Sequence, residues 1–121
     1  MQKSFDKKGL EERTAKFGEE IIVFCKKLSQ DTISKPIINQ LVRSATSIGA
    51  NYMEANSACS RKDFKNKIFL CKKESEEVKH WLRMTARCFP ENRLEVIKLW
   101  KEGQELTMIF QKITNSLRKI E

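Results

Sequence analysis

Apolar side chains recur at three- and four-residue steps through nearly the whole chain, and this spacing is what most constrains its fold. Such a step places successive side chains on one face of an α-helix, because the helix has 3.6 residues per turn. The first run consists of Leu10, Thr14, Phe17, Ile21, Phe24 and Leu28. No segment alternates apolar and polar residues as a half-buried β-strand does. The pattern therefore predicts an all-α fold.

Three interruptions divide this pattern into four helices. Polar residues at Gln30-Asp31 end the first run, the capping motif Ser60–Asp63 precedes the third, and Pro90 precedes the fourth. Connections this short place consecutive helices antiparallel to one another. The sequence thus predicts a single domain, residues 1–121, folded as an antiparallel up-down-up-down four-helix bundle. The helices are expected near residues 6–29, 35–58, 61–88 and 91–120.

The composition excludes several classes of protein. The 121 residues include only four glycines and two prolines, which is too few for a turn-rich β-sandwich or barrel. No run of apolar residues is long enough to span a membrane, and no apolar segment follows Met1 as in a signal peptide. We therefore expect a cytoplasmic protein that does not bind membranes.

Residue types that support catalysis or bind metals are scarce. His80 is the only histidine, and the four cysteines, Cys25, Cys59, Cys71 and Cys88, form no CxxC pair. The glycines are scattered singly, so no phosphate-binding loop is present. We expect four reduced and fairly buried thiols, no metal site, no cofactor and no enzymatic activity.

Positive charge is concentrated in the third predicted helix. The chain has a net charge of +8, and the segment 59–89 carries nine basic and four acidic residues, so it supplies +5 of that total. Six basic side chains share one face of this helix, interrupted by Glu76. They are the candidate nucleic-acid-binding residues Arg61, Lys65, Lys72, Lys79, Arg83 and Arg87.

A basic helix face is more often a solvated surface than a binding site. Here the high net charge and a stripe about 39 Å long, at 1.5 Å per residue, favour binding of RNA or DNA. No helix-turn-helix spacing and no aromatic RNA-recognition motif occurs. Binding would therefore use backbone phosphates, with little reading of the bases.

The second predicted helix is poor in charge. From Ser44 to Ser60 only Glu54 is charged, and such depletion is typical of interface cores. Carboxylates beside large apolar groups on the third helix suggest a contact that also supplies cations, and Arg43 is a candidate partner for Glu74 or Glu77. The candidates for an oligomer interface or a buried polar network are Arg43, Ser47, Asn51, Glu54, Glu74, Glu77 and Trp81.

Three segments resemble one known family. Residues Leu41–Ala55 are similar to the RSxxSIxxNxxEA signature of the four-helix-bundle proteins encoded in 23S ribosomal RNA intervening sequences. Residues Ser60–Phe64 with Lys67 resemble that family's SrkdFxxK segment, and residues 73–83 resemble its KEaxETxyWLr segment. The chain departs from the family pattern at Ser75, Val78 and His80, where the usual residues are Ala, Thr and Tyr.

The resemblance implies a bacterial four-helix bundle that assembles as a ring-shaped homopentamer with a positively charged surface. The family is similar to accessory proteins of diversity-generating retroelements, which bind a reverse transcriptase and nucleic acid, and it carries no known enzymatic activity. The matching family positions in this chain are Arg43, Ser47, Asn51, Glu54, Phe64, Lys67, Glu74, Glu77 and Trp81.

Two hypotheses about function follow. In the first, the protein is a non-enzymatic oligomer that binds RNA or DNA through phosphate contacts. In the second, it is a structural adaptor that recruits a protein partner such as a reverse transcriptase, and its basic charge complements that partner. Affinity that falls steeply with salt favours the first hypothesis, whereas a co-purifying protein that resists nuclease treatment favours the second.

Overall fold

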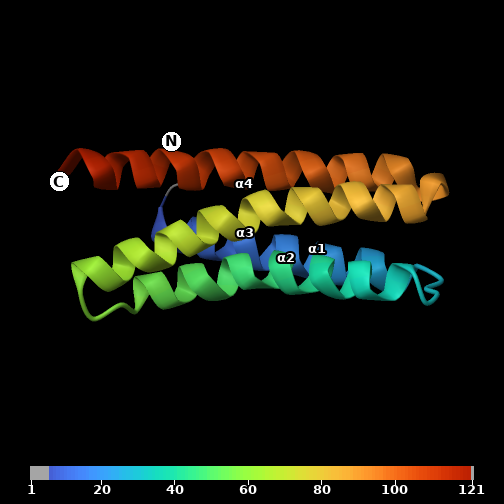
Figure 1. Ribbon diagram of the computed structural model, residues 1–121. Helices are drawn as coiled ribbons and strands as arrows, with labels where there is room; N and C mark the ends of the chain where they lie inside the picture. Colours follow the sequence, from blue (N-terminus) through green and yellow to red (C-terminus); the bar gives the residue numbers. More distant parts are fainter. Residues whose placement is uncertain (1–5, 121) are drawn as a thin grey trace.

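Four long antiparallel helices pack side by side into a bundle (Figure 1). The computed structural model describes residues 6–120, and this part of the chain contains no β-strand. The connections 27–33 and 89–92 lie at one end of the bundle, and the connection 57–60 lies at the other. The elements are α1 (Lys7–Lys26), α2 (Ser34–Asn56), α3 (Arg61–Cys88), the short 3-10 helix η2 (Pro90–Asn92) and α4 (Arg93–Ile120). The predicted all-α four-helix bundle is confirmed.

Short polar side chains cap the starts of the first three helices. The Ser60 hydroxyl accepts a hydrogen bond from the Asp63 N–H at 3.0 Å, as the capping motif predicted. Asp6 does the same for Gly9 at 2.7 Å. At the start of α2, a carboxylate oxygen of Asp31 accepts the Ser34 N–H at 2.8 Å, and this bond is the main reason that the pKa of Asp31 is lowered. These caps satisfy amide groups that have no partner inside the helix.

The first helix ends three residues before its predicted boundary. α1 stops at Lys26, although Leu28 is still buried, with 9% of its surface exposed. The apolar spacing predicted a longer helix because it indicates which side chains are buried, not where the helix ends. A side chain in the connection after the helix can also enter the core. At the other break, Phe89 is buried and the 3-10 helix η2 separates α3 from α4 at Pro90.

The predicted apolar stripes form one core to which all four helices contribute. Phe17, Leu41, Leu82 and Phe110 are 0–1% exposed, and the rings of Phe110 and Tyr52 meet edge to face at 5.7 Å between centroids. Hydroxyl groups within the core are satisfied locally. Ser75, for example, donates to the carbonyl oxygen of Cys71, one turn earlier, at 2.8 Å.

The helices are not equally close to their neighbours. α2 lies between α1 and α3, and α3 packs along α4, so α1 lies diagonally across the bundle from α3. α1 and α4 approach one another least closely, and ion pairs bridge them. Arg13 donates to Glu102 at 2.8 Å and to Glu105 at 2.6 Å, and the bond to Glu102 is the largest contribution to the raised pKa of Arg13.

The cysteines are all free thiols, and one of them contradicts the expectation of burial. Cys25 and Cys71 are buried, and burial raises their pKa values to about 11 and about 12. Cys88 is half-buried, but Cys59 is exposed because it lies in the turn between α2 and α3. Within residues 6–120, no cluster of histidine, cysteine or acidic residues could hold a metal ion, and no helix is long and apolar enough to cross a lipid bilayer.

Candidate nucleic-acid interface and polar network

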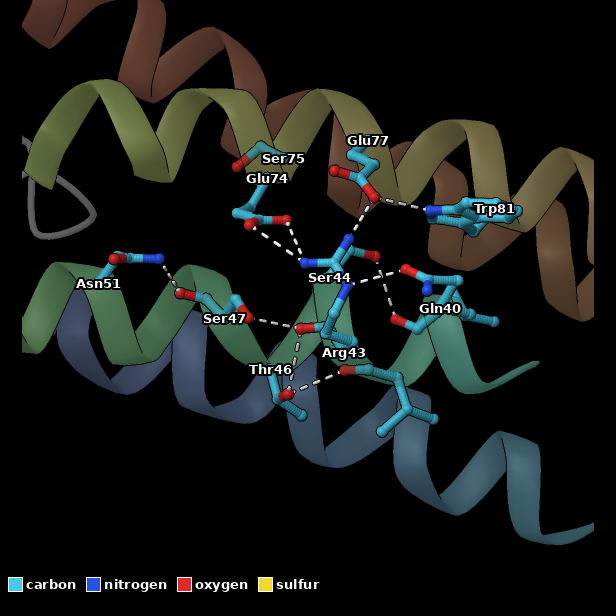
Figure 2. Close-up of polar contacts among 12 residues, drawn as sticks. Gln40, Arg43, Ser44, Thr46, Ser47, Asn51, Glu74, Ser75, Glu77 and Trp81 are labelled. Carbon is cyan, nitrogen blue, oxygen red and sulfur yellow. Dashed lines mark hydrogen bonds and ion pairs between the residues drawn. The ribbon is translucent and has the colours of Figure 1, made fainter. Parts of the chain in front are cut away.

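A polar network centred on Arg43 joins α2 to α3 (Figure 2). Its guanidinium donates to both carboxylate oxygens of Glu74 at 3.2 Å and also to Glu77. Its Nε donates to the side chain of Gln40 at 2.8 Å. The same oxygen of Glu77 accepts the indole N–H of Trp81 at 2.9 Å. The structure therefore brings Arg43 together with both carboxylates that the sequence offered as alternatives.

The network is only partly withdrawn from water. The side chain of Arg43 is 42% exposed, whereas Glu74 is 13% exposed and Glu77 is 30% exposed. The hydrogen bond from Trp81, followed by the bond and charge of Arg43, lowers the pKa of Glu77 below its ordinary value of 4.5. Glu77 therefore stays ionised and, with Glu74, holds Arg43 across the α2–α3 boundary.

The remaining interface candidates lie along the same boundary but make other contacts. The hydroxyl of Ser47 donates to the Arg43 carbonyl oxygen at 2.7 Å, and the Asn51 amide donates to the Ser47 carbonyl oxygen at 2.9 Å. Glu54 does not join the network, because Lys67 binds it at 2.7 Å nearer the connection between α2 and α3. The packing of α2 against α3 within one chain thus accounts for part of the charge depletion of α2, without a contact between subunits.

Among the described residues, some cations are neutralised by carboxylates, whereas others, including Lys8, Lys16 and Lys26 of α1, form no ion pair. Arg13, Lys27, Arg43 and Lys67 each form an ion pair with a carboxylate. Within the described part of the chain, by contrast, four side chains of the predicted basic face have no ion-pair or hydrogen-bond partner. They are Arg61, Lys72, Arg83 and Arg87. The charge of this face is therefore left for solvent or for a ligand.

Three residues of the predicted stripe, Lys65, Lys72 and Lys79, are half-buried, whereas Arg61, Arg83 and Arg87 are exposed. Lys79 is half-buried against α4, where its ammonium group lies 2.5 Å from the Gln104 side-chain oxygen and 5.5 Å from the centre of the Trp100 ring. Lys65 is also half-buried and has an interaction of its own. The stripe that the sequence treated as one face therefore divides into exposed and half-buried cations, and Lys79 among the latter lies against α4.

Sequence reasoning missed the contribution of α4 to this surface. The acidic residues Glu102 and Glu105 face α1, where Arg13 binds them. The opposite flank of α4 carries Trp100, Gln104 and Arg118 and lies along α3. The sequence shows that acidic residues lie on one flank of α4 and neutral and basic residues on the other. It does not show that the first flank faces α1 and the second faces α3.

The comparisons with known proteins identify the family. The sequence profile of the 23S rRNA-intervening sequence protein family matches residues 10–112. The chain belongs to this family. The match extends beyond the second and third helices, on which the resemblance rested, into α1 and α4.

A solved structure agrees with this family assignment. The crystal structure of a protein of unknown function from the S23 ribosomal protein family of Bacteroides thetaiotaomicron is 28% identical to this chain, with a TM-score of 0.81. The match covers 90% of this chain and 97% of that one. No curated protein sequence matches this 23S rRNA-intervening sequence protein.

The Arg43 network gives a prediction about stability. Arg43→Ala should lower the free energy of unfolding by about 1–3 kcal/mol, because it leaves the poorly exposed Glu74 carboxylate without its partner. The loss should be smaller in acid, since stability that depends on ionised Glu77 is present above pH 4.5 and disappears as the pH falls through its lowered pKa. Urea unfolding at several pH values measures both effects.

A matched control separates this effect from simple loss of charge. Lys35 is an exposed cation on α2, outside the network, so Lys35→Ala should leave stability nearly unchanged. Arg43→Lys keeps the charge but cannot bind two carboxylates with a planar fork, so it should recover only part of the loss. If Arg43→Ala and Lys35→Ala behaved alike, the network would contribute nothing to stability.

Proposed function

We propose that this protein is a non-enzymatic, oligomeric nucleic-acid-binding protein that holds RNA or DNA by phosphate contacts along α3. The family name associates its members with intervening sequences of 23S ribosomal RNA, and this agrees with a partner made of RNA. The proposed phosphate ligands are the four basic side chains without an internal partner, Arg61, Lys72, Arg83 and Arg87.

This proposal rests on the concentration, along one face of α3, of cations that form no ion pair among the described residues. Elsewhere Arg13, Lys27 and Lys67 pair with carboxylates, so the fields of these charges cancel at a distance. On α3, Glu76 lies within the basic face but forms no ion pair among the described residues. An unneutralised row of cations attracts a polyanion over long range and releases condensed counterions when phosphates bind.

We further propose that the protein assembles as a homo-oligomer, a pentamer by resemblance to its family. Five chains of 14.2 kDa would form a closed ring of roughly 71 kDa. A ring would repeat the α3 face around its circumference, and simultaneous contacts would raise the avidity for a long nucleic acid. The charge-poor α2 surface and the face of α3 that carries Leu70 and Trp81 are the proposed contacts between subunits.

Two triple variants with the same net charge test the proposed binding site. The face variant carries alanine at Lys72, Arg83 and Arg87. The α1 control carries alanine at three exposed lysines on the helix diagonally across the bundle, Lys8, Lys16 and Lys26. Fluorescence anisotropy with a labelled oligothymidylate and a labelled duplex measures the affinity of each protein.

The face variant should bind both probes at least about ten-fold more weakly than the parent, because it loses three phosphate contacts. The α1 control should bind within about two-fold of the parent, since only the diffuse charge has changed. Light scattering must show the same oligomeric state for all three proteins. Equal weakening in the two variants would mean that net charge, and not the α3 face, governs binding.

The adaptor function remains the second candidate because of a groove on the other side of the molecule. The groove lies between α1 and α2, has a volume of about 900 Å³, and exposes 39% of Ile22 and 59% of Met53 beside the carboxylates of Glu12 and Glu19. A protein that is retained after nuclease treatment and lost on Met53→Glu would favour the adaptor function.

A further inference from the structure

Two aromatic rings lie beside cations where α3 meets α4. The Lys79 ammonium lies 5.5 Å from the centre of the Trp100 ring, and the Arg118 guanidinium lies 5.2 Å from the centre of the Phe69 ring. Each pair joins one residue of α3 to one of α4. Trp100 is 39% exposed, and Phe69 is half-buried, so neither ring belongs to the core of the bundle.

These aromatic residues lie on the same surface as the unpaired cations. Phe69, Lys72, Lys79 and Arg83 are separated by three, seven and four residues, which keeps them on one face of α3. We call this surface the α3–α4 seam, and it consists of Phe69, Lys72, Lys79, Arg83, Trp100, Gln104 and Arg118. Phe69 and Lys79 are ten residues apart on α3, so the two aromatic pairs are separated by about 15 Å along that helix.

The α4 side of the seam contains no carboxylate among its described residues. Glu102 and Glu105, the two acids in the middle of α4, are held by Arg13 on the flank that faces α1. Gln104 instead faces α3, where it accepts the Lys79 hydrogen bond. A polyanion on the seam would therefore meet no acid from α4, but on α3 it would meet Glu76, which lies between Lys72 and Lys79 on the same face.

We propose that the α3–α4 seam binds single-stranded nucleic acid, with bases stacked on Trp100 and Phe69 and phosphates held by Lys72 and Arg83. This inference rests on the proposed phosphate binding along α3 and adds the strandedness of the ligand. Aromatic rings beside a row of cations are features by which proteins bind single strands without reading sequence. The bases of a duplex are already stacked on one another, so a duplex gains the phosphate contacts alone.

Lys79 has a specific part in this arrangement. Its ammonium group is held by Gln104 and by the Trp100 ring, which fixes the ring against α3. A ring that is already immobilised loses little conformational entropy when a base stacks on it. Trp100 is thus a preorganised stacking platform, and Lys79 is a positioning residue for it.

Substitutions of the two rings test this inference separately from phosphate binding. Trp100→Leu and Phe69→Leu remove the aromatic face but keep an apolar side chain in contact with its neighbours. Each should weaken binding of oligothymidylate about ten-fold and leave binding of a duplex of equal length within about two-fold. Leu94→Ala is the control, because Leu94 lies on α4, outside the seam, and is 83% exposed.

Tryptophan fluorescence provides a second readout. In a Trp81→Phe background, where Trp100 is the only indole, oligothymidylate should quench the emission by stacking, and the duplex should quench it much less. Selective loss of single-strand affinity together with this quenching supports the inference. Equal effects of Trp100→Leu on both probes, or no effect on either, overturn it while phosphate binding stands. Failure of the parent to bind either probe overturns both proposals.

Discussion

Phe110→Ala is expected to lower the free energy of unfolding by about 3–5 kcal/mol, the largest effect on stability that we expect from one substitution. Phe110 is 0% exposed, and its ring packs edge to face on Tyr52 at 5.7 Å. Truncation removes the transfer free energy of a whole ring and leaves a cavity where α2 and α4 share the core. Urea unfolding followed by circular dichroism measures the change.

The matched control lies two residues earlier on the same helix. Met108 is 60% exposed, so Met108→Ala should change the free energy of unfolding by less than about 0.5 kcal/mol. Both variants place alanine within α4, and they differ chiefly in the burial of the side chain that is removed. Comparable destabilisation by the two substitutions would contradict the assignment of Phe110 to the centre of the core.

The helices and their buried faces could be predicted from the sequence because each rests on local information. Leu10, Phe17 and Ile21 recur at helical spacing, and all three are fully or nearly fully buried. Ser60 and Pro90 mark helix ends through the chemistry of one turn of chain. The end of α1 was predicted less well, because Leu28 keeps the apolar spacing after the helix has stopped.

Contacts between helices were harder to predict, because they depend on the axial register of neighbouring helices. The sequence singled out Arg43 and two carboxylates, but it placed Glu54 in the same network, whereas the structure pairs Glu54 with Lys67. The ion pairs of Arg13 with Glu102 and Glu105 were missed altogether. Residues nearly ninety positions apart meet there only because α1 and α4 are neighbours.

The candidate binding face depends both on local helical periodicity and on the contacts between helices. Helical periodicity alone aligned six basic residues on the third helix. The structure adds that Lys79 is half-buried against α4 and that Trp100 lies beside it. No local pattern could identify Trp100, because its place in the seam follows from the packing of α4 along α3.

The second large effect concerns the salt dependence of binding to duplex DNA. The four basic side chains without an internal partner would neutralise four phosphates per chain. The logarithm of the association constant should then fall against the logarithm of salt concentration with a slope near about −3.6. Raising the salt from about 50 to about 200 mM should weaken binding by the parent about 150-fold.

This slope, compared between the parent and the face variant, is the most direct test of the central claim that α3 binds phosphates. The face variant keeps only Arg61 of the four, so its slope should be near about −0.9, and the same change in salt should weaken its binding only about 3.5-fold. The α1 control should retain the slope of the parent, with light scattering showing one oligomeric state for all three proteins. Equal slopes for the parent and the face variant would contradict the account, because the basic face of α3 would then be a solvated surface.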